Sequence, residues 1–157
     1  MCYFVTLGVP SASEGSVRFF SDAGFEVERS SNESLLTAFG TAAFHVTIGG
    51  CSCDLHSSDR DLRAKYERKG WSATKIRRAL RDRQSSGTHG AGKRFRGALR
   101  EFVSVAGEAL VFGHWYSGAV EDEAVQPLRS VRIDIEQYLA SDNVFREDEL
   151  LVVGRNA

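Results

Sequence analysis

The sequence contains only two prolines and three cysteines among its 157 residues, and it has no long hydrophobic run. Crossing a bilayer takes about 20 consecutive apolar residues, so we expect no membrane partner. The longest N-terminal apolar stretch, Cys2–Val9, lacks a basic lead and ends at Pro10, which indicates a strand rather than a secretion signal. Because an odd number of cysteines suits a disulfide framework poorly, we expect a cytoplasmic protein with reduced thiols.

The residues that are present have the proportions of a globular protein. Hydrophobic residues make up 42% and charged residues 26% of the sequence, which is enough apolar material for a buried core. The length predicts a single domain over residues 1–157. Arginine outnumbers lysine sixteen to four. Either a GC-rich genome or a need for forked donors that bind two acceptor oxygens explains this ratio.

Two segments are apolar on both alternating faces, which is typical of strands inside a sheet: Cys2–Val9 and Glu108–Tyr116. Other apolar patterns predict strands at residues 25–29, 43–49, 131–133 and 150–153, and helices at 12–23, 59–69, 73–83, 93–106 and 134–140. Residues 35–39 fit a helical turn and a strand equally well. Ser11 and Glu14 have the spacing of a capping box, which predicts that the first helix begins there. The mixture predicts the α+β class.

The order of strand, helix, strand, strand, helix and strand in residues 2–29, 43–49 and 93–116 is similar to the ferredoxin-like α/β sandwich. The resemblance implies an α/β core formed by residues 2–53 and 93–116. Residues 54–92 are then a basic helical insertion, and residues 117–157 are a C-terminal β/α extension. Because the resemblance depends on element order alone, it implies no function.

Positive charge is concentrated in the middle of the chain. Residues 59–100 hold fourteen of the twenty Lys and Arg residues, whereas residues 1–58 and 101–157 are acidic. On the predicted helix 73–83, apolar residues follow one stripe and cations occupy the remaining arc. We therefore expect a cationic surface, extended by the next helix, that binds a polyanion or a protein partner. Its residues are Lys75, Arg77, Arg78, Arg81, Lys93, Arg94, Arg96 and Arg100.

Three interpretations of this surface are open. Cations neutralise phosphates and release counterions, which predicts binding to nucleic acid or another polyanion. Complementary charged patches also speed specific association, which predicts an acidic protein partner, as for an inhibitor or immunity-type partner of a toxin. Alternatively, the cations are solvated or pair with the acidic ends of the same chain. Arg77 and Arg81 repel one another on one helix face, so their presence favours a ligand or an internal acid.

Two stretches in the basic region resemble known motifs. The helices joined through Gly70, Trp71 and Ser72 look like a helix-turn-helix unit. Residues 87–94, Gly-Thr-His-Gly-Ala-Gly-Lys-Arg, resemble the phosphate loop G-x-x-x-x-G-K-[ST]. Arg94 replaces the hydroxyl residue that reaches Mg²⁺, and the preceding element is a helix instead of a strand. A flexible linker with weak anion binding is the simpler interpretation.

The stretch Cys51-Ser52-Cys53-Asp54-Leu55-His56 gathers thiol, carboxylate and imidazole groups. Cys51, Cys53 and His56 are candidate metal ligands that a side chain such as His45, Cys2 or His114 completes. Zinc motifs usually separate their cysteines by two to four residues, so a single intervening residue fits poorly. A second interpretation is a catalytic thiol at Cys51 or Cys53, with a pKa lowered by the nearby basic helices. The third is two small side chains packed in a tight turn.

His114 lies on the two-faced strand, where it is either a hydrogen-bonded core residue or a catalytic base. The acidic runs at residues 121–123 and 147–149 either hold a cation, mimic phosphates or are solvated. No motif requires a cofactor, and we expect none. The sequence predicts a non-enzymatic cytoplasmic binding domain whose basic helical insertion engages a polyanion such as nucleic acid. The alternatives are a protein-interaction module and a small thiol-dependent enzyme.

Overall fold

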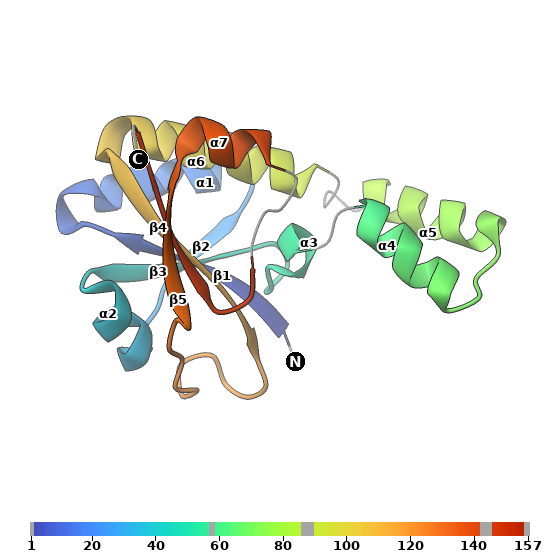
Figure 1. The fold of residues 1–157 in the computed structure, drawn as a ribbon, viewed down its shortest axis with the longest axis horizontal. Helices are drawn as coiled ribbons and strands as arrows, with labels where there is room; N and C mark the ends of the chain where they lie inside the picture. The colour runs from blue at the N-terminus through green and yellow to red at the C-terminus, as the bar shows by residue number, and fades with distance from the viewer. Residues whose placement is uncertain (1, 57–58, 86–89, 142–145, 156–157) are drawn as a thin grey trace.

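The computed structural model describes residues 2–56, 59–85, 90–141 and 146–155, and it shows an α+β fold, which confirms the predicted class (Figure 1). In these residues, six strands form one mixed sheet in the order β2-β3-β1-β4-β6-β5. Neighbouring strands are antiparallel, except that β5 and β6 are parallel. The strands are β1 (Cys2–Val9), β2 (Glu26–Arg29), β3 (Ala42–Thr47), β4 (Glu108–Tyr116), β5 (Arg129–Asp134) and β6 (Glu149–Gly154).

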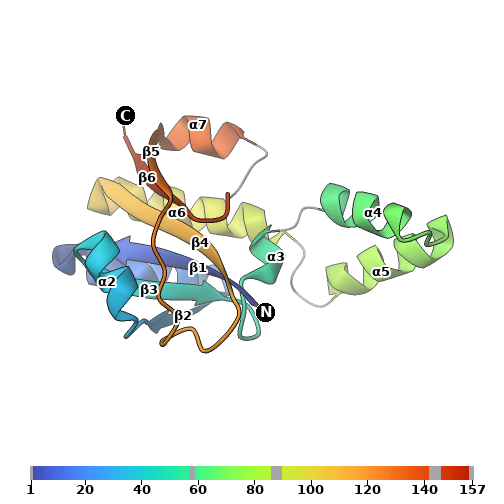
Figure 2. The same cartoon turned by 60° about the horizontal axis from the view of Figure 1, so that its bottom comes forward.

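Helices cover both faces of this sheet, with α1, α6 and α7 on one face and α2 on the other (Figures 1 and 2). The helical segments are η1 (Ser11–Val17), α1 (Arg18–Asp22), α2 (Glu33–Phe39), α3 (Cys53–His56), α4 (Asp59–Arg68), α5 (Ala73–Ser85), α6 (Ala91–Ala106) and α7 (Ile135–Ala140). Within the described ranges, no helix combines the length and apolarity needed to cross a membrane.

The first helical segment begins differently from its prediction. η1 is a 3-10 helix that follows Pro10, and no side chain caps it, so the capping box predicted at Ser11 and Glu14 is wrong. The Glu14 carboxylate instead accepts a hydrogen bond of 3.0 Å from Arg29 of β2. The regular helix α1 begins only at Arg18.

The larger core lies between α6 and the sheet. Apolar residues recur along α6 at helical spacing, and Phe95 and Phe102 are among those that are buried. The centre of the Phe95 ring lies 5.2 Å from that of Phe20 and 6.0 Å from that of Phe25. Aromatic pairs of this kind contribute roughly 0.5–1.5 kcal/mol beyond the burial of the rings. This cluster therefore holds α1 and α6 against one face of the sheet.

The opposite face has a smaller core. There α2 buries Leu35 and Phe39, and the Phe39 ring lies 6.4 Å from that of Phe112 in β4. Asn32 begins the helix, because its side-chain oxygen accepts hydrogen bonds from the backbone N–H groups of Ser34 and Leu35. Residues 35–39, whose sequence pattern fits a helical turn and a strand equally well, are thus helical.

The C-terminal residues enlarge the sheet. β6 lies between β4 and β5, so the last strand is internal and β5 forms the edge. Asp134 begins α7 by accepting a hydrogen bond of 2.8 Å from the backbone N–H of Glu136. This extension brings Glu147 and Asp148, in the turn that leads into β6, beside β4.

α4 and α5 form a helical hairpin, called the basic hairpin below, that projects from the rest of the molecule, the body (Figures 1 and 2). The chain turns between them at Gly70, whose φ of 72° favours glycine. Ser72 begins α5, since its hydroxyl accepts a hydrogen bond of 3.3 Å from the backbone N–H of Lys75. Ile76 and Leu80 are buried in the hairpin.

Candidate functional site

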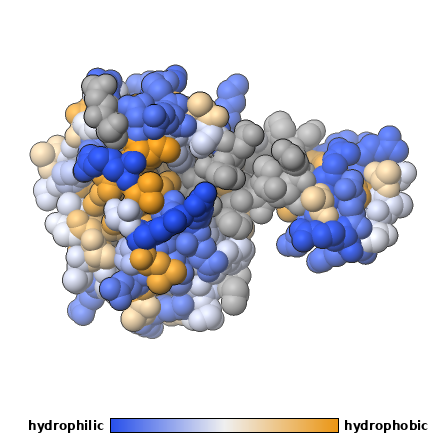
Figure 3. Space-filling view, in the orientation of Figure 1, coloured by the Kyte–Doolittle hydropathy of each residue, from blue (hydrophilic) through white to orange (hydrophobic). Residues whose placement is uncertain are grey.

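The outer surface of the basic hairpin carries its positive charge. α5 buries Ile76 and Leu80 on one side, and the remaining arc of the helix faces water. Four of the predicted binding residues are exposed on this arc: Lys75, Arg77, Arg78 and Arg81. In the view of Figure 3, the hairpin presents a largely hydrophilic surface.

The first helix of the hairpin adds cations that the sequence analysis did not name individually. Arg63, Lys65 and Arg68 of α4 are exposed, and so is Lys69 at its end. The signal for them was present, because they belong to the same basic stretch. Their place beside α5 makes the cationic surface a property of both helices.

The hairpin lies apart from the two acidic runs of the chain (Figures 1 and 2). Arg78 Nε lies 3.9 Å from Asp82 Oδ2 on the same helix, and both side chains are exposed. Exposed pairs of this kind contribute at most about 1 kcal/mol. The acidic runs at residues 121–123 and 147–149 belong to the body, from which the hairpin projects (Figures 1 and 2).

Stacked side chains stiffen the turn of the hairpin. The rings of Tyr66 and Trp71 are parallel within 2°, with centres 4.5 Å apart. Lys75 Nζ lies 4.0 Å from the centre of the Trp71 ring, a cation–π contact worth about 0.5–1 kcal/mol at an exposed site. These contacts fix α4 relative to α5, so the cations of both helices are presented together.

The predicted cations of α6 are placed differently. Lys93 is exposed, but the guanidinium carbon of Arg94 lies 5.6 Å from the centre of the Phe25 ring. Arg96 donates a hydrogen bond of 3.4 Å to the carbonyl oxygen of Leu139. Arg100 donates one of 2.9 Å to the carboxylate of Glu136. Three of these four side chains therefore have contacts on the body.

The segment from Cys51 to Cys53 is hydrogen-bonded to the N-terminal half of β1. Ser52 donates a backbone hydrogen bond of 2.7 Å to the carbonyl oxygen of Tyr3, and its hydroxyl accepts one of 2.8 Å from the N–H of Val5. Burial, with a hydrogen bond to Cys53, raises the pKa of the Cys51 thiol to about 11. This direction is opposite to the one that a reactive thiol requires.

Two other sequence features fall outside the described residues. The side chain of His56 is one of them, so the metal site at Cys51, Cys53 and His56 stays a prediction. Residues 87–89 of the phosphate-loop resemblance are the other. The described part of that loop begins at Gly90, which has a left-handed φ of 73° and precedes α6.

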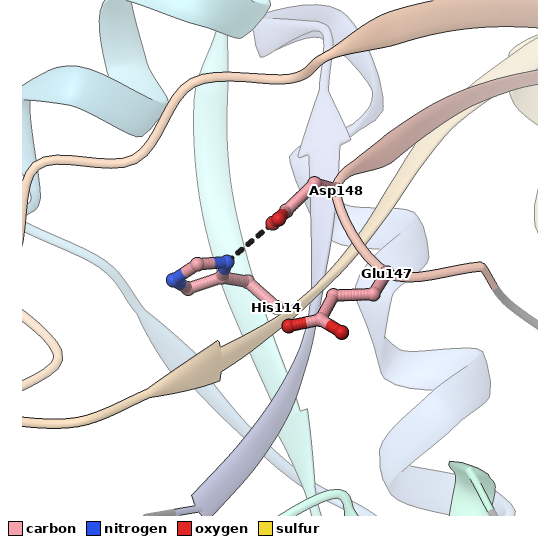
Figure 4. A group of neighbouring side chains, drawn as sticks. All are labelled: His114, Glu147 and Asp148. Carbon is pink, nitrogen blue, oxygen red and sulfur yellow. Dashed lines mark hydrogen bonds and ion pairs between the residues drawn. The ribbon is translucent and has the colours of Figure 1, made fainter.

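His114 lies beside carboxylates of the run at residues 147–149 (Figure 4), and a carboxylate of the run at 121–123 approaches its other ring nitrogen. Its Nδ1 forms a hydrogen bond with the Asp148 carboxylate, and its Nε2 lies 3.4 Å from Glu123 Oε1. The backbone N–H groups of Gly118 and Ser117 donate to Glu123 at 3.0 Å and 2.8 Å, and they lower the pKa of that carboxyl to about 2. Ligand atoms of His114, Asp148 and the neighbouring Glu147 lie within 4.8 Å of one another. In the sequence, His114 and the two acidic runs are separate candidates, far apart along the chain.

A second histidine, His45, is buried on the same face of the sheet. Its Nδ1 lies 3.0 Å from the hydroxyl of Thr6, and its Nε2 lies 3.5 Å from Glu121 Oε1. The order of hydroxyl, imidazole and carboxylate is that of an acyl-transfer triad. Thr6, however, is completely buried, so its hydroxyl cannot reach a substrate. Burial lowers the pKa of His45, and the Glu121 carboxylate offsets only part of this effect.

Acidification is expected to destabilise the protein through His45. The pKa of His45 in the folded protein is below its ordinary value of 6.5, so the unfolded chain binds the proton more readily. The contribution of neutral His45 is present above pH 6.5 and is lost as the pH falls through the lower, folded pKa. Urea unfolding at about pH 7.5 and 5.5 should show a smaller loss of stability for His45→Gln than for the wild type. Equal losses would contradict this assignment.

Comparison with known proteins identifies no relative: no protein-family model, curated protein or solved structure matches the chain. A functional conclusion therefore depends on the charge and geometry of this chain. Two features stand out on that basis. One is the cationic surface of the basic hairpin, and the other is the cluster around His114.

Proposed function

We propose that the protein is a binding domain that engages nucleic acid, or a polyanion of similar charge density, through the basic hairpin. The observation that supports this proposal is a set of exposed cations on two helices that project from an acidic body. Cations beside phosphates release condensed counterions, and this effect does not depend on base sequence. Binding with little sequence preference is the expected behaviour.

The spacing of the cations on α5 suits a nucleic-acid backbone. Lys75 and Arg81 are six residues apart, which corresponds to about 9 Å along a helix. The grooves of duplex DNA are roughly 6 and 12 Å wide, so cations at the two ends of this stretch can contact phosphates on both strands. The stacked turn at Tyr66 and Trp71 limits the conformational entropy that such binding costs.

The affinity of the wild-type protein for a short DNA duplex is expected to fall steeply with salt. If four to seven cations contact phosphates, a plot of log K against log salt concentration has a slope of about −4 to −6. Fluorescence anisotropy between roughly 50 and 200 mM NaCl measures this slope. Absence of binding to both duplex and single-stranded DNA and RNA at the lowest salt would rule out the nucleic-acid proposal.

An acidic protein partner is the second candidate, as for an inhibitor or immunity-type protein. The observation that favours it is the separation of charge between hairpin and body, since complementary patches accelerate specific association. Affinity capture from a nuclease-treated lysate distinguishes the two candidates. A stoichiometric protein that is retained after nuclease treatment favours the protein partner, and loss of the captured material favours nucleic acid.

We further propose that β1–β4, α1 and α6 form a ferredoxin-like core. Two observations support this assignment: β2-β3-β1-β4 are antiparallel neighbours in that order, and α1 and α6 cover the same face of the sheet. The basic hairpin is then an insertion between β3 and α6. β5, α7 and β6 extend the sheet beyond β4.

A further inference from the structure

Three side chains of the types that bind metal ions meet where β4 lies beside the turn before β6 (Figure 4). They are His114, Glu147 and Asp148, and one ligand atom from each lies within 4.8 Å of the others. Ligands bound to one ion at about 2.1 Å lie roughly 3–4 Å apart, so small side-chain rotations, above all of the exposed Glu147, bring these atoms to that spacing. We propose that these three residues bind a divalent transition-metal cation.

The backbone holds the two carboxylates beside the imidazole. The N–H of Asp148 donates a hydrogen bond of 2.9 Å to the carbonyl oxygen of Gly113, the residue before His114. Glu147 forms an isolated parallel β-bridge with the same glycine. The N–H of Leu128 donates a hydrogen bond of 2.8 Å to the carbonyl oxygen of Asp148. The ligand positions are therefore fixed by main-chain contacts, which a solvated acidic loop does not require.

The carboxylates around the His114 imidazole favour a positive charge between its Nδ1 atom and Asp148. A neutral histidine has one donor nitrogen and one acceptor nitrogen, yet both nitrogens of His114 face carboxylates. When Nε2–H donates to Glu123, the Nδ1 lone pair faces Asp148, and two acceptors repel one another unless a cation lies between them. A proton satisfies this pair alone, whereas a metal ion also engages Glu147.

Glu123 is placed to accept a hydrogen bond from the His114 ring nitrogen that would not bind the ion. Its carboxylate is fixed by the N–H groups of Ser117 and Gly118, and it lies 3.4 Å from the ring nitrogen that faces away from Asp148. Carboxylates in this position orient metal-binding imidazoles and select the tautomer with its lone pair toward the metal. The arrangement thus includes both the direct ligands and the group that supports one of them.

The donor set indicates the class of cation. One imidazole nitrogen with two carboxylate oxygens suits Mn²⁺, Fe²⁺, Co²⁺ or Zn²⁺, because soft metals select thiolates and Mg²⁺ and Ca²⁺ prefer oxygen alone. Glu147 is exposed, so the site is open to solvent. Three protein ligands in an open site leave coordination positions for water or for a group of a bound ligand.

Binding of Mn²⁺ to the intact protein tests the proposal, with free ion measured by electron paramagnetic resonance. Mn²⁺ is the suitable probe because it prefers carboxylate and imidazole to the thiols of Cys51 and Cys53. We expect one Mn²⁺ per chain, and Zn²⁺ should displace it. Glu147→Gln should weaken binding at least about tenfold without loss of the fold, because this side chain is exposed.

Asp122→Asn is the matched control. It removes one exposed carboxylate from the run that contains Glu123 but removes no ligand, so Mn²⁺ affinity should change less than about twofold. Three results overturn the proposal: no binding at about 1 mM Mn²⁺, an unchanged affinity in Glu147→Gln, or an equal loss in both variants. The last result means that the acidic surface attracts the ion without forming a site.

Discussion

Replacing Lys75, Arg77, Arg78 and Arg81 together by glutamine is expected to lower the affinity for duplex DNA by about 4,000-fold at 0.1 M salt. If each side chain contacts one phosphate, each loss removes the release of about 0.9 counterion, which is worth nearly tenfold at that salt concentration. The slope of log K against log salt concentration should become less negative by about 3.6. Fluorescence anisotropy over a salt series measures both quantities.

The quadruple variant should keep its fold. Its four positions are exposed, and glutamine is about as favourable in a helix as lysine or arginine. The substitution also removes the repulsion between Arg77 and Arg81, worth a few tenths of a kcal/mol. Ile76 and Leu80, which hold α5 against α4, are unchanged. A loss of affinity in this variant therefore reports the lost charges, provided that circular dichroism shows unchanged helix content.

A second quadruple variant removes the same number of charges from another place. Lys93, Arg94, Arg96 and Arg100 of α6 are replaced by glutamine. Three of these side chains contact the body, so we expect less than about a tenfold loss of affinity together with a lower stability. Equal losses in the two variants would show that binding follows net charge, and the hairpin would no longer be the site.

The position of the basic hairpin illustrates what local sequence can predict. Gly70, Ser72 and the apolar stripe at Ile76 and Leu80 determine where the two helices begin, end and bury their side chains. Those signals act over a few residues. The contacts of Arg94, Arg96 and Arg100 with distant partners depend on how α6 packs, and the charge pattern of the helix contains no information about that packing.

The cluster at His114 could not be predicted, because its members meet through strand pairing. Asp148 follows His114 by 34 residues, and the two come together only because β6 inserts between β4 and β5. Sequence patterns predicted both strands but not their neighbours, since sheet order depends on long-range contacts. A usable signal was present: a histidine on a two-faced apolar strand and two acidic runs that each lie next to a strand.

Gly113→Ala is expected to destabilise the protein by about 3 kcal/mol, because the new methyl group overlaps a buried ring. A Cβ at this position would lie 1.9 Å from the hydroxyl oxygen of Tyr3 and 2.7 Å from the ring carbon that bears it. Tyr3 is fully buried, with its ring 5.2 Å from that of Trp115, so it has no free space into which to turn. Either β4 or Tyr3 must therefore shift. Urea unfolding measures the loss.

Two further variants separate this overlap from a general cost of replacing glycine. Gly97 on the exposed side of α6 has nothing within 4 Å of an added Cβ, so Gly97→Ala should stabilise the protein by about 0.5–1 kcal/mol. In a Tyr3→Leu background the ring is absent, and Gly113→Ala should cost at least about 1 kcal/mol less than in the wild type. If its cost is the same in both backgrounds, contact with Tyr3 is not the reason for glycine at position 113. If the cost falls as expected, the Tyr3 ring packed against position 113 is what requires glycine there.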